Sequence, residues 1–211
     1  MTNGTLWPGL FLAVCGIDGS GKTTQIKCVV DHFAGRRAVL STRQPTDRYR
    51  NDPMVRSLLN LEIDSEAVVR ELALLAAFDR ARHIRTEILP ALYDGGMVVT
   101  DRYVYSTYAY FLARGISDVE WLRQLNCLAP EPDATIYIDV PPEIAVERIL
   151  LRDGSSRKRE EIDVARMRQV RAAFHGQPWG RSSRYHVVDG NRPQSAVTTE
   201  VLRIVTAAEC Q

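Results

Sequence analysis

The feature that most constrains this chain is the stretch formed by residues 10–24. An apolar run of strand length, Leu10–Cys15, leads directly into the pattern Gly16-x-x-x-x-Gly21-Lys22-Thr23. Glycines let the backbone bend with several N–H groups pointing inward, and a helix that starts there adds the positive end of its dipole. Helically spaced apolar residues follow in 26–33, which completes the context that this motif requires. The stretch therefore predicts a phosphate-binding loop.

The residue types in this loop each suit the binding of a nucleoside triphosphate. The Lys22 ammonium can reach the β- and γ-phosphates, and the Thr23 hydroxyl can be a ligand of Mg²⁺. The nucleotide-binding residues that we expect are Gly16, Asp18, Gly19, Ser20, Gly21, Lys22, Thr23 and Thr24.

Length and composition indicate an ordinary globular protein. The 211 residues suit one compact domain, 1–211, with 45% hydrophobic and 25% charged residues. The formal net charge of +1 argues against nucleic acid as a partner. Four cysteines lack metal-ligand spacing, and neither a signal peptide nor a membrane-length apolar run is present. We therefore expect reduced thiols, no membrane partner and a cytoplasmic location.

Further strands alternate with helical patterns along the chain. The strands that we predict are 38–42, 97–101, 134–140 and 185–188, in addition to the first. The polar stretch 47–53 is predicted to be a loop, and 65–93 a long helix that Pro90 kinks or ends. Such alternation predicts an α/β fold with a parallel sheet covered on both faces.

An acidic residue, Asp101, ends the apolar strand at 97–101. In P-loop proteins this is the place of the carboxylate that holds Mg²⁺, here expected to act through water. The alternative is that Asp101 only caps the helix that follows. The phosphate-binding loop upstream favours the metal role.

Several shorter patterns follow the loop in a fixed order. They are Arg43-x-Pro45, Asp79-Arg80, Asp101-Arg102-Tyr103 with Ser106 and Tyr110 behind it, and Pro132-Asp133. With the loop, they make nearly the whole chain resemble the thymidylate kinase (dTMP kinase) family of P-loop nucleoside-monophosphate kinases. The resemblance implies a three-layer fold with five parallel strands in the order 2-3-1-4-5. It also implies a homodimer that transfers a phosphoryl group from ATP, with Mg²⁺, to a deoxynucleoside 5′-monophosphate, most simply dTMP.

The resemblance also implies roles for the acceptor-side residues. Arg102 would hold the acceptor phosphate and bridge it to the donor, with Arg43 on the phosphate side as well. Arg80 would contact the acceptor's phosphate and base, and Tyr110 would crowd the 2′ position of the sugar. The substrate-binding set is Asp18, Arg43, Arg80, Arg102, Ser106 and Tyr110.

A second charged segment is expected to complete catalysis. Phosphoryl transfer spreads negative charge over the equatorial oxygens, so cations are needed on the donor side. Some family members carry an arginine in the P-loop where this chain has Gly19, which leaves a lid at about 152–162 as the source. A solvated charged surface is the alternative. The catalytic set is Lys22, Asp101, Arg102 and the lid arginines Arg152, Arg157 and Arg159.

Three departures from the family pattern lie on the acceptor side. Gln44 stands in place of a glutamate, Ala76 in place of the phenylalanine that stacks on thymine, and Phe111 in place of a frequent glutamine. Three ways to fill the space at position 76 are open: a ring from Tyr105, Tyr108 or Phe111, a register shift that brings in Phe78, or a C5 substituent larger than methyl.

Two other functions therefore stay open at this point. One is the same chemistry on a modified or C5-enlarged pyrimidine deoxynucleotide. The other is a non-catalytic P-loop switch that binds a nucleoside triphosphate, which leaves Asp101-Arg102-Tyr103 and Tyr110 without a role.

Overall fold

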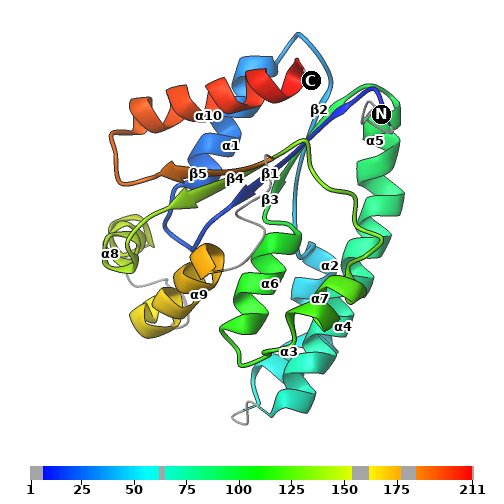
Figure 1. Cartoon of the computed structure of the whole chain (residues 1–211), viewed down its shortest axis with the longest axis vertical. Helices are drawn as coiled ribbons and strands as arrows, with labels where there is room; N and C mark the ends of the chain where they lie inside the picture. The colour runs from blue at the N-terminus through cyan, green and yellow to red at the C-terminus, as the bar shows by residue number, and fades with distance from the viewer. Residues whose placement is uncertain (1–6, 62–64, 154–161, 177–183, 211) are drawn as a thin grey trace.

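A five-stranded parallel sheet forms the centre of the protein (Figure 1). The computed structural model describes residues 7–61, 65–153, 162–176 and 184–210. The strands are β1 (Leu10–Cys15), β2 (Val39–Arg43), β3 (Met97–Asp101), β4 (Ala134–Asp139) and β5 (Tyr185–Asp189). Their order across the sheet is β2-β3-β1-β4-β5, and every neighbouring pair is parallel. This order confirms the fold expected from the resemblance.

Helices cover both faces of the sheet, as parallel strands require. Helices α1 and α10 lie together on one face, and α4 and α6 lie on the other (Figure 1). The helices are α1 (Lys22–Phe33), α2 (Asp47–Asn51), α3 (Pro53–Leu59), α4 (Glu66–His83), α5 (Leu89–Tyr93), α6 (Val104–Leu112), α7 (Val119–Leu125), α8 (Pro142–Asp153), α9 (Val164–Gly176) and α10 (Gln194–Glu209). A π-helical segment, η1 (Ile84–Ile88), joins α4 to α5.

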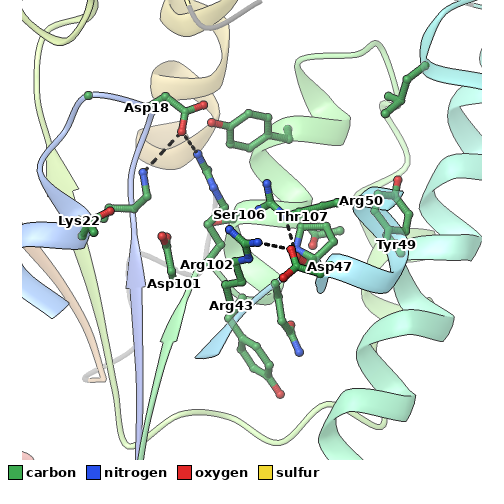
Figure 2. A pocket seen from close by; sticks show the side chains of 18 of the residues that line it. Asp18, Lys22, Arg43, Asp47, Tyr49, Arg50, Asp101, Arg102, Ser106 and Thr107 are labelled. Carbon is green, nitrogen blue, oxygen red and sulfur yellow. Dashed lines mark hydrogen bonds and ion pairs between the residues drawn. The ribbon is translucent and has the colours of Figure 1, made fainter. Parts of the chain in front are cut away.

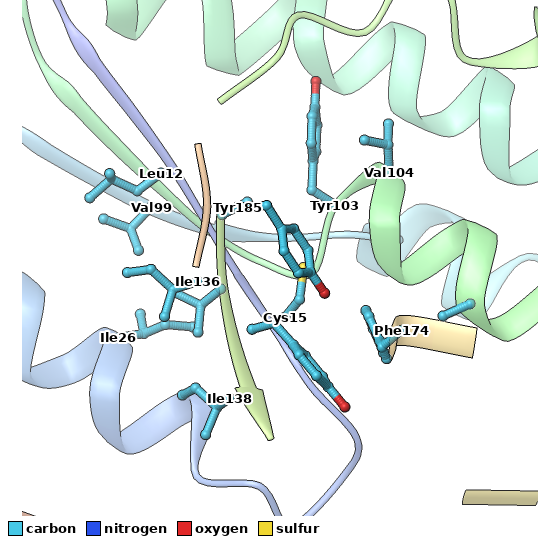
Figure 3. Close-up of a cluster of buried hydrophobic side chains, with 14 of the residues drawn as sticks. Leu12, Cys15, Ile26, Val99, Tyr103, Val104, Ile136, Ile138, Phe174 and Tyr185 are labelled. Carbon is cyan, nitrogen blue, oxygen red and sulfur yellow. The ribbon is translucent and has the colours of Figure 1, made fainter. Parts of the chain in front are cut away.

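The central strands are fully buried because they carry apolar side chains on both faces. Leu12, Val99 and Ile136 of three adjacent strands are each 0% exposed. Figure 3 shows them beside Ile26 of α1, while Tyr185 and Phe174 lie on the other side of the sheet. This burial makes the sheet a rigid platform for the loops at its carboxyl end.

The register brings the carboxyl ends of three strands together. Asp101 of β3 lies opposite Arg43 of β2 on one side and Val14 of β1 on the other. The phosphate-binding loop begins immediately after β1. The sheet therefore places the loop, the acidic strand end and Arg43 at a single edge, where ligands bind in open α/β sheets.

Two sequence-based predictions of local structure need correction. Residues 47–51 form the short helix α2 rather than a loop, and their five residues are too few for a periodic pattern to reveal. The segment 65–93 is not one regular helix, since it widens into η1 just before α5. Pro90 has no N–H for a regular helical bond and its ring crowds the preceding turn, which accounts for the wider turn. Ser65 caps the start of α4, since its hydroxyl accepts a hydrogen bond from the Val68 N–H.

Two further observations concern the helices and the cysteines. No helix in the part of the chain that the structure describes is long and apolar enough to cross a membrane. All four cysteines are described, and each is a free thiol.

Candidate active site

A pocket of about 930 Å³ opens at the carboxyl edge of β1, β2 and β3. Its lining combines the phosphate-binding loop with residues from β2, α2, α4, α6 and α8, and Figure 2 shows the side chains near its centre. The volume lies at the upper end of the range for small-molecule sites. One cavity thus joins segments that are far apart in the sequence.

The loop after β1 is built on glycine conformations. Gly19 and Gly21 have φ angles of +77° and +95°. Residues with a Cβ atom adopt such backbone angles only with strain. A Cβ at Gly19 would also collide with the backbone carbonyl of Ala145 in α8. No side chain caps the start of α1, so its first N–H groups are open to an anion. The geometry is that of a phosphate cradle.

Lys22 lies in the floor of this loop. Its side chain is buried, and Nζ donates to the Ile17 carbonyl oxygen at 2.9 Å. The Asp18 carboxylate lies 3.9 Å from Nζ. Burial, together with the charge of Arg102, lowers the pKa of Lys22 to about 8. A phosphate in the loop would favour the charged ammonium.

Arg102, directly after β3, connects the loop to the rest of the pocket. Its Nη1 donates to the Gly16 carbonyl at 3.0 Å. Its Nη2 donates to the Asp18 carboxylate at 2.7 Å, as Figure 2 shows. The guanidinium lies 4.7 Å over the ring of Tyr110. Arg102 has a φ of +67°, a strained value for a residue with a side chain. The charge of Arg102 holds the pKa of Asp18 at about 2, although burial opposes the shift.

The Mg²⁺ expected at Asp101 can be tested against the residues present. The Asp101 Oδ1 atom is buried and has no hydrogen-bond partner among the described residues, and it faces the same pocket as Thr23. Among the described residues, no group of three or more His, Cys, Asp or Glu side chains is placed so that it could hold a metal ion. Mg²⁺ is usually held by one or two carboxylates with waters and substrate phosphates. A carboxylate oxygen without a hydrogen-bond partner, in the same pocket as the Thr23 hydroxyl, fits it.

The opposite end of the pocket is rich in arginine. Arg43 of β2 forms an ion pair with Asp47 of α2. Arg50 of α2 lines the same wall, and Figure 2 shows both arginines on the side of the pocket away from Lys22. Positive charge is therefore present at both ends of one cavity, which suits two phosphorylated ligands.

Comparisons with known proteins agree with this geometry. A family model described as Thymidylate kinase matches residues 14–201. The chain belongs to the thymidylate kinase family. A probable thymidylate kinase of Pyrobaculum calidifontis is 36% identical over 200 residues, 94% of this chain and 97% of the relative. A thymidylate kinase of Dinoroseobacter shibae is 35% identical over 205 residues, 95% and 98% of the two chains. A probable thymidylate kinase of Pyrococcus horikoshii is 45% identical over 147 residues, 68% and 71%.

Membership in the thymidylate kinase family makes the chain a nucleoside-monophosphate kinase that uses ATP as its phosphoryl donor. Most of the site residues predicted from the sequence line this pocket. Those that line it are Asp18, Gly19, Gly21, Lys22, Thr23, Thr24, Arg43, Asp101, Arg102, Ser106, Tyr110 and Arg152. Gly16 and Ser20 do not line it. Gly16 leaves no room for a side chain, since a Cβ there would lie 2.5 Å from the Ser20 hydroxyl.

Arg80 is the clearest departure from the expected site of a thymidylate kinase. It is 2% exposed and lies behind the pocket wall rather than in its lining. Its Nε donates to Gln44 Oε1 at 2.8 Å, and its two Nη atoms donate to Asn126 and Thr107. Gln44 and Thr107 do line the pocket, so Arg80 supports them from behind. These three bonds hold the guanidinium behind the wall, and the direct acceptor contact that the resemblance implies stays a prediction.

The structure separates the proposed ways of filling the space at Ala76. Phe78 is 69% exposed and does not line the pocket, so the register-shift hypothesis is wrong. Tyr105 and Tyr108 are also absent from the lining, whereas Phe111 and Ala76 both belong to it. Two residues along a helix point to different sides, which explains the outward position of Phe78. Of the three rings considered for this space, Phe111 is the one that lines the pocket together with Ala76.

The predicted lid falls largely outside the described residues. Arg152, at the end of α8, lines the pocket. Arg157 and Arg159 lie in residues 154–161, which the structure does not describe. Their role stays a prediction.

Several pocket residues were missed in the sequence. The arginines that line the pocket without having been predicted are Arg50, Arg56, Arg114 and Arg148. Two of them come from segments 47–53 and 54–61, in which no motif marks a site. The polar run with Arg48, Tyr49 and Arg50 was the only available signal.

Proposed function

We propose that this protein transfers the γ-phosphoryl group of ATP to dTMP, giving ADP and dTDP. The observation that carries the proposal is the contact of Lys22 and Arg102 with the same carboxylate, that of Asp18. It brings the donor-side cation and the acceptor-side cation into one pocket. The comparisons with named thymidylate kinases favour dTMP over the two alternatives considered in the sequence analysis.

On the donor side, the loop residues bind and orient the triphosphate. The backbone N–H groups at the start of α1 and the Lys22 ammonium face the β- and γ-phosphates. Thr23 and Asp101 would hold Mg²⁺, with Asp101 acting through water. Bound there, the ion would neutralise phosphate charge during transfer.

On the acceptor side, Arg102 and Arg43 bind the phosphate of dTMP, so that one of its oxygens faces the γ-phosphorus. Arg43 must exchange its Asp47 partner for that phosphate. The Tyr110 ring lies under the Arg102 guanidinium. From there it would lie beside the sugar and would disfavour a 2′-hydroxyl. Ser106 and Phe111 line the part of the pocket that takes the sugar and base.

Catalysis then consists of alignment and charge compensation. The acceptor oxygen forms a bond to the γ-phosphorus while the bond to the ADP oxygen breaks, and no covalent enzyme intermediate is required. Arg102, Lys22 and the arginines of 152–162 stabilise the negative charge on the transferred group.

We also propose that the enzyme is a cytoplasmic homodimer, as the family resemblance implies. Leu74 and Phe78, four residues apart on α4, are 51% and 69% exposed and form one apolar surface. A dimer that buries this surface should become monomeric in Phe78→Glu. Sedimentation of the wild type as a monomer at micromolar concentration would contradict it.

An acceptor screen tests the proposed reaction. ADP release is measured with ATP and Mg²⁺ in the presence of each deoxynucleoside and ribonucleoside monophosphate, and of C5-enlarged dUMP analogues. We expect the highest kcat/KM with dTMP. Preference for an enlarged analogue would support the alternative acceptor, and slow hydrolysis independent of any acceptor would support the switch.

A further inference from the structure

Arg43, Arg50 and Arg102 are three of the arginines that line the pocket, and they differ in their partners. Arg43 is paired with Asp47, and Arg102 is paired with Asp18. For Arg50, no carboxylate partner is present among the described residues. Arg50 thus lines the cavity without a carboxylate partner among the described residues.

The side chain of Arg50 is held by the turn that precedes its helix, α2. Its Nε donates to the Pro45 carbonyl at 2.9 Å, which holds the base of the guanidinium against the β2–α2 turn. Arg56 braces the same backbone, donating to the Arg50 carbonyl at 3.1 Å and to the Asn51 side chain at 2.7 Å. A guanidinium held by Nε keeps its two Nη groups for a further acceptor.

The surroundings of Arg50 favour an anion. Partial desolvation and then the charges of Arg102 and Arg43 lower the pKa of Arg50, which shows that the three cations repel one another. The charges of Asp101 and Asp18 raise the pKa of Arg50 but only partly offset this repulsion. A dianion between the three groups would remove it and would accept several charge-assisted hydrogen bonds.

We propose that Arg50 is a further substrate-binding residue, whose Nη groups hold the 5′-phosphate of the acceptor together with Arg43 and Arg102. This inference rests on the proposed function, since it takes a nucleoside monophosphate as the acceptor. It assigns to α2 a role that no motif in residues 47–53 indicates.

Arg48 provides a matched control on the same helix. It stands two residues from Arg50, so its side chain points away, and it lines a separate hollow of about 280 Å³ with Asp79 and Glu87. Arg48→Gln and Arg50→Gln therefore remove the same charge from opposite sides of one short helix.

The test compares binding of dTMP with binding of thymidine, which lacks the phosphate, by calorimetry on the full chain. We expect Arg50→Gln to weaken dTMP binding by about tenfold or more and to leave thymidine binding unchanged. Arg48→Gln should leave both unchanged. Arg50→Lys, which keeps the charge without the planar fork, should recover part of the loss.

Two results would overturn the proposal. One is dTMP binding within twofold of wild type in Arg50→Gln, and the other is an equal loss for dTMP and thymidine, which would indicate packing alone. If the wild type prefers another monophosphate, the proposed function is wrong. The role of Arg50 is then tested by the same comparison, made with that monophosphate and the corresponding nucleoside. A wild type that binds no monophosphate refutes both.

Discussion

The Nη2 atom of Arg102 donates to the Asp18 carboxylate at 2.7 Å, although the two residues are 84 positions apart. Asp18 also lies 3.9 Å from Lys22 Nζ. The Asp18 carboxylate thus attracts both cations and offsets the repulsion between them. It keeps Lys22 and Arg102 beside the phosphate-binding loop. Because Arg102 has a left-handed backbone conformation, its guanidinium is held there at a local cost.

Replacement of Lys22 by alanine should abolish phosphoryl transfer and preserve the fold. Lys22 faces the loop rather than the apolar core, and its charge is needed for the phosphates. Steady-state kinetics and circular dichroism on the same samples measure the two effects. Retention of more than about a tenth of kcat, which is a loss of less than about 1.4 kcal/mol, would contradict the role.

The affinity for ATP should depend on pH through Lys22. Its pKa of about 8 means that the free protein loses this positive charge above pH 8 and keeps it below. Bound phosphate favours the charged form, so the affinity for a non-hydrolysable ATP analogue should be level from pH 6.5 to 7.5 and fall above pH 8. The slope should approach tenfold per pH unit. Lys22→Met should bind weakly with no such slope, and an identical slope in that variant would assign the titration to another group.

Neutralising the lid arginines should slow the chemical step. In the triple variant Arg152→Ala, Arg157→Ala, Arg159→Ala, kcat should fall by at least tenfold while the KM for dTMP changes little, because these charges act on the transferred group. Turnover at the wild-type level would mean that another arginine, such as Arg148 in the pocket lining, supplies the charge.

Phe111 should contribute to binding of the base. Phe111→Ala should raise the KM for dTMP several-fold with kcat largely retained, since a stacked ring adds about 0.5–1.5 kcal/mol beyond its buried area. Adding Ala76→Phe to that variant should restore part of the affinity, because both positions line one space. Tyr93→Ala, at a surface position that is 58% exposed, is the matched control. A lowered Tm with an unchanged KM would leave Phe111 as a core residue only.

The sequence by itself determined the phosphate-binding loop, the acidic end of β3 and the alternation that produces a parallel sheet. These features depend on neighbours in the chain: glycine spacing, strand-length apolar runs and helical periodicity. The sheet edge followed from them, because parallel strands carry their carboxyl ends to one side. The family patterns then indicated Arg43, Ser106 and Tyr110 as pocket residues, which the structure brings together.

Only the tertiary structure decided which way particular side chains face. Arg80 belongs to a family pattern but is held behind the wall by Gln44, Asn126 and Thr107, which stand 27 to 46 positions away. Arg50 belongs to no pattern but lines the pocket, because the short helix α2 is fixed there by contacts of Pro45 and Arg56. Hydrogen bonds and packing between distant segments determine such orientations, and local periodicity contains no information about them.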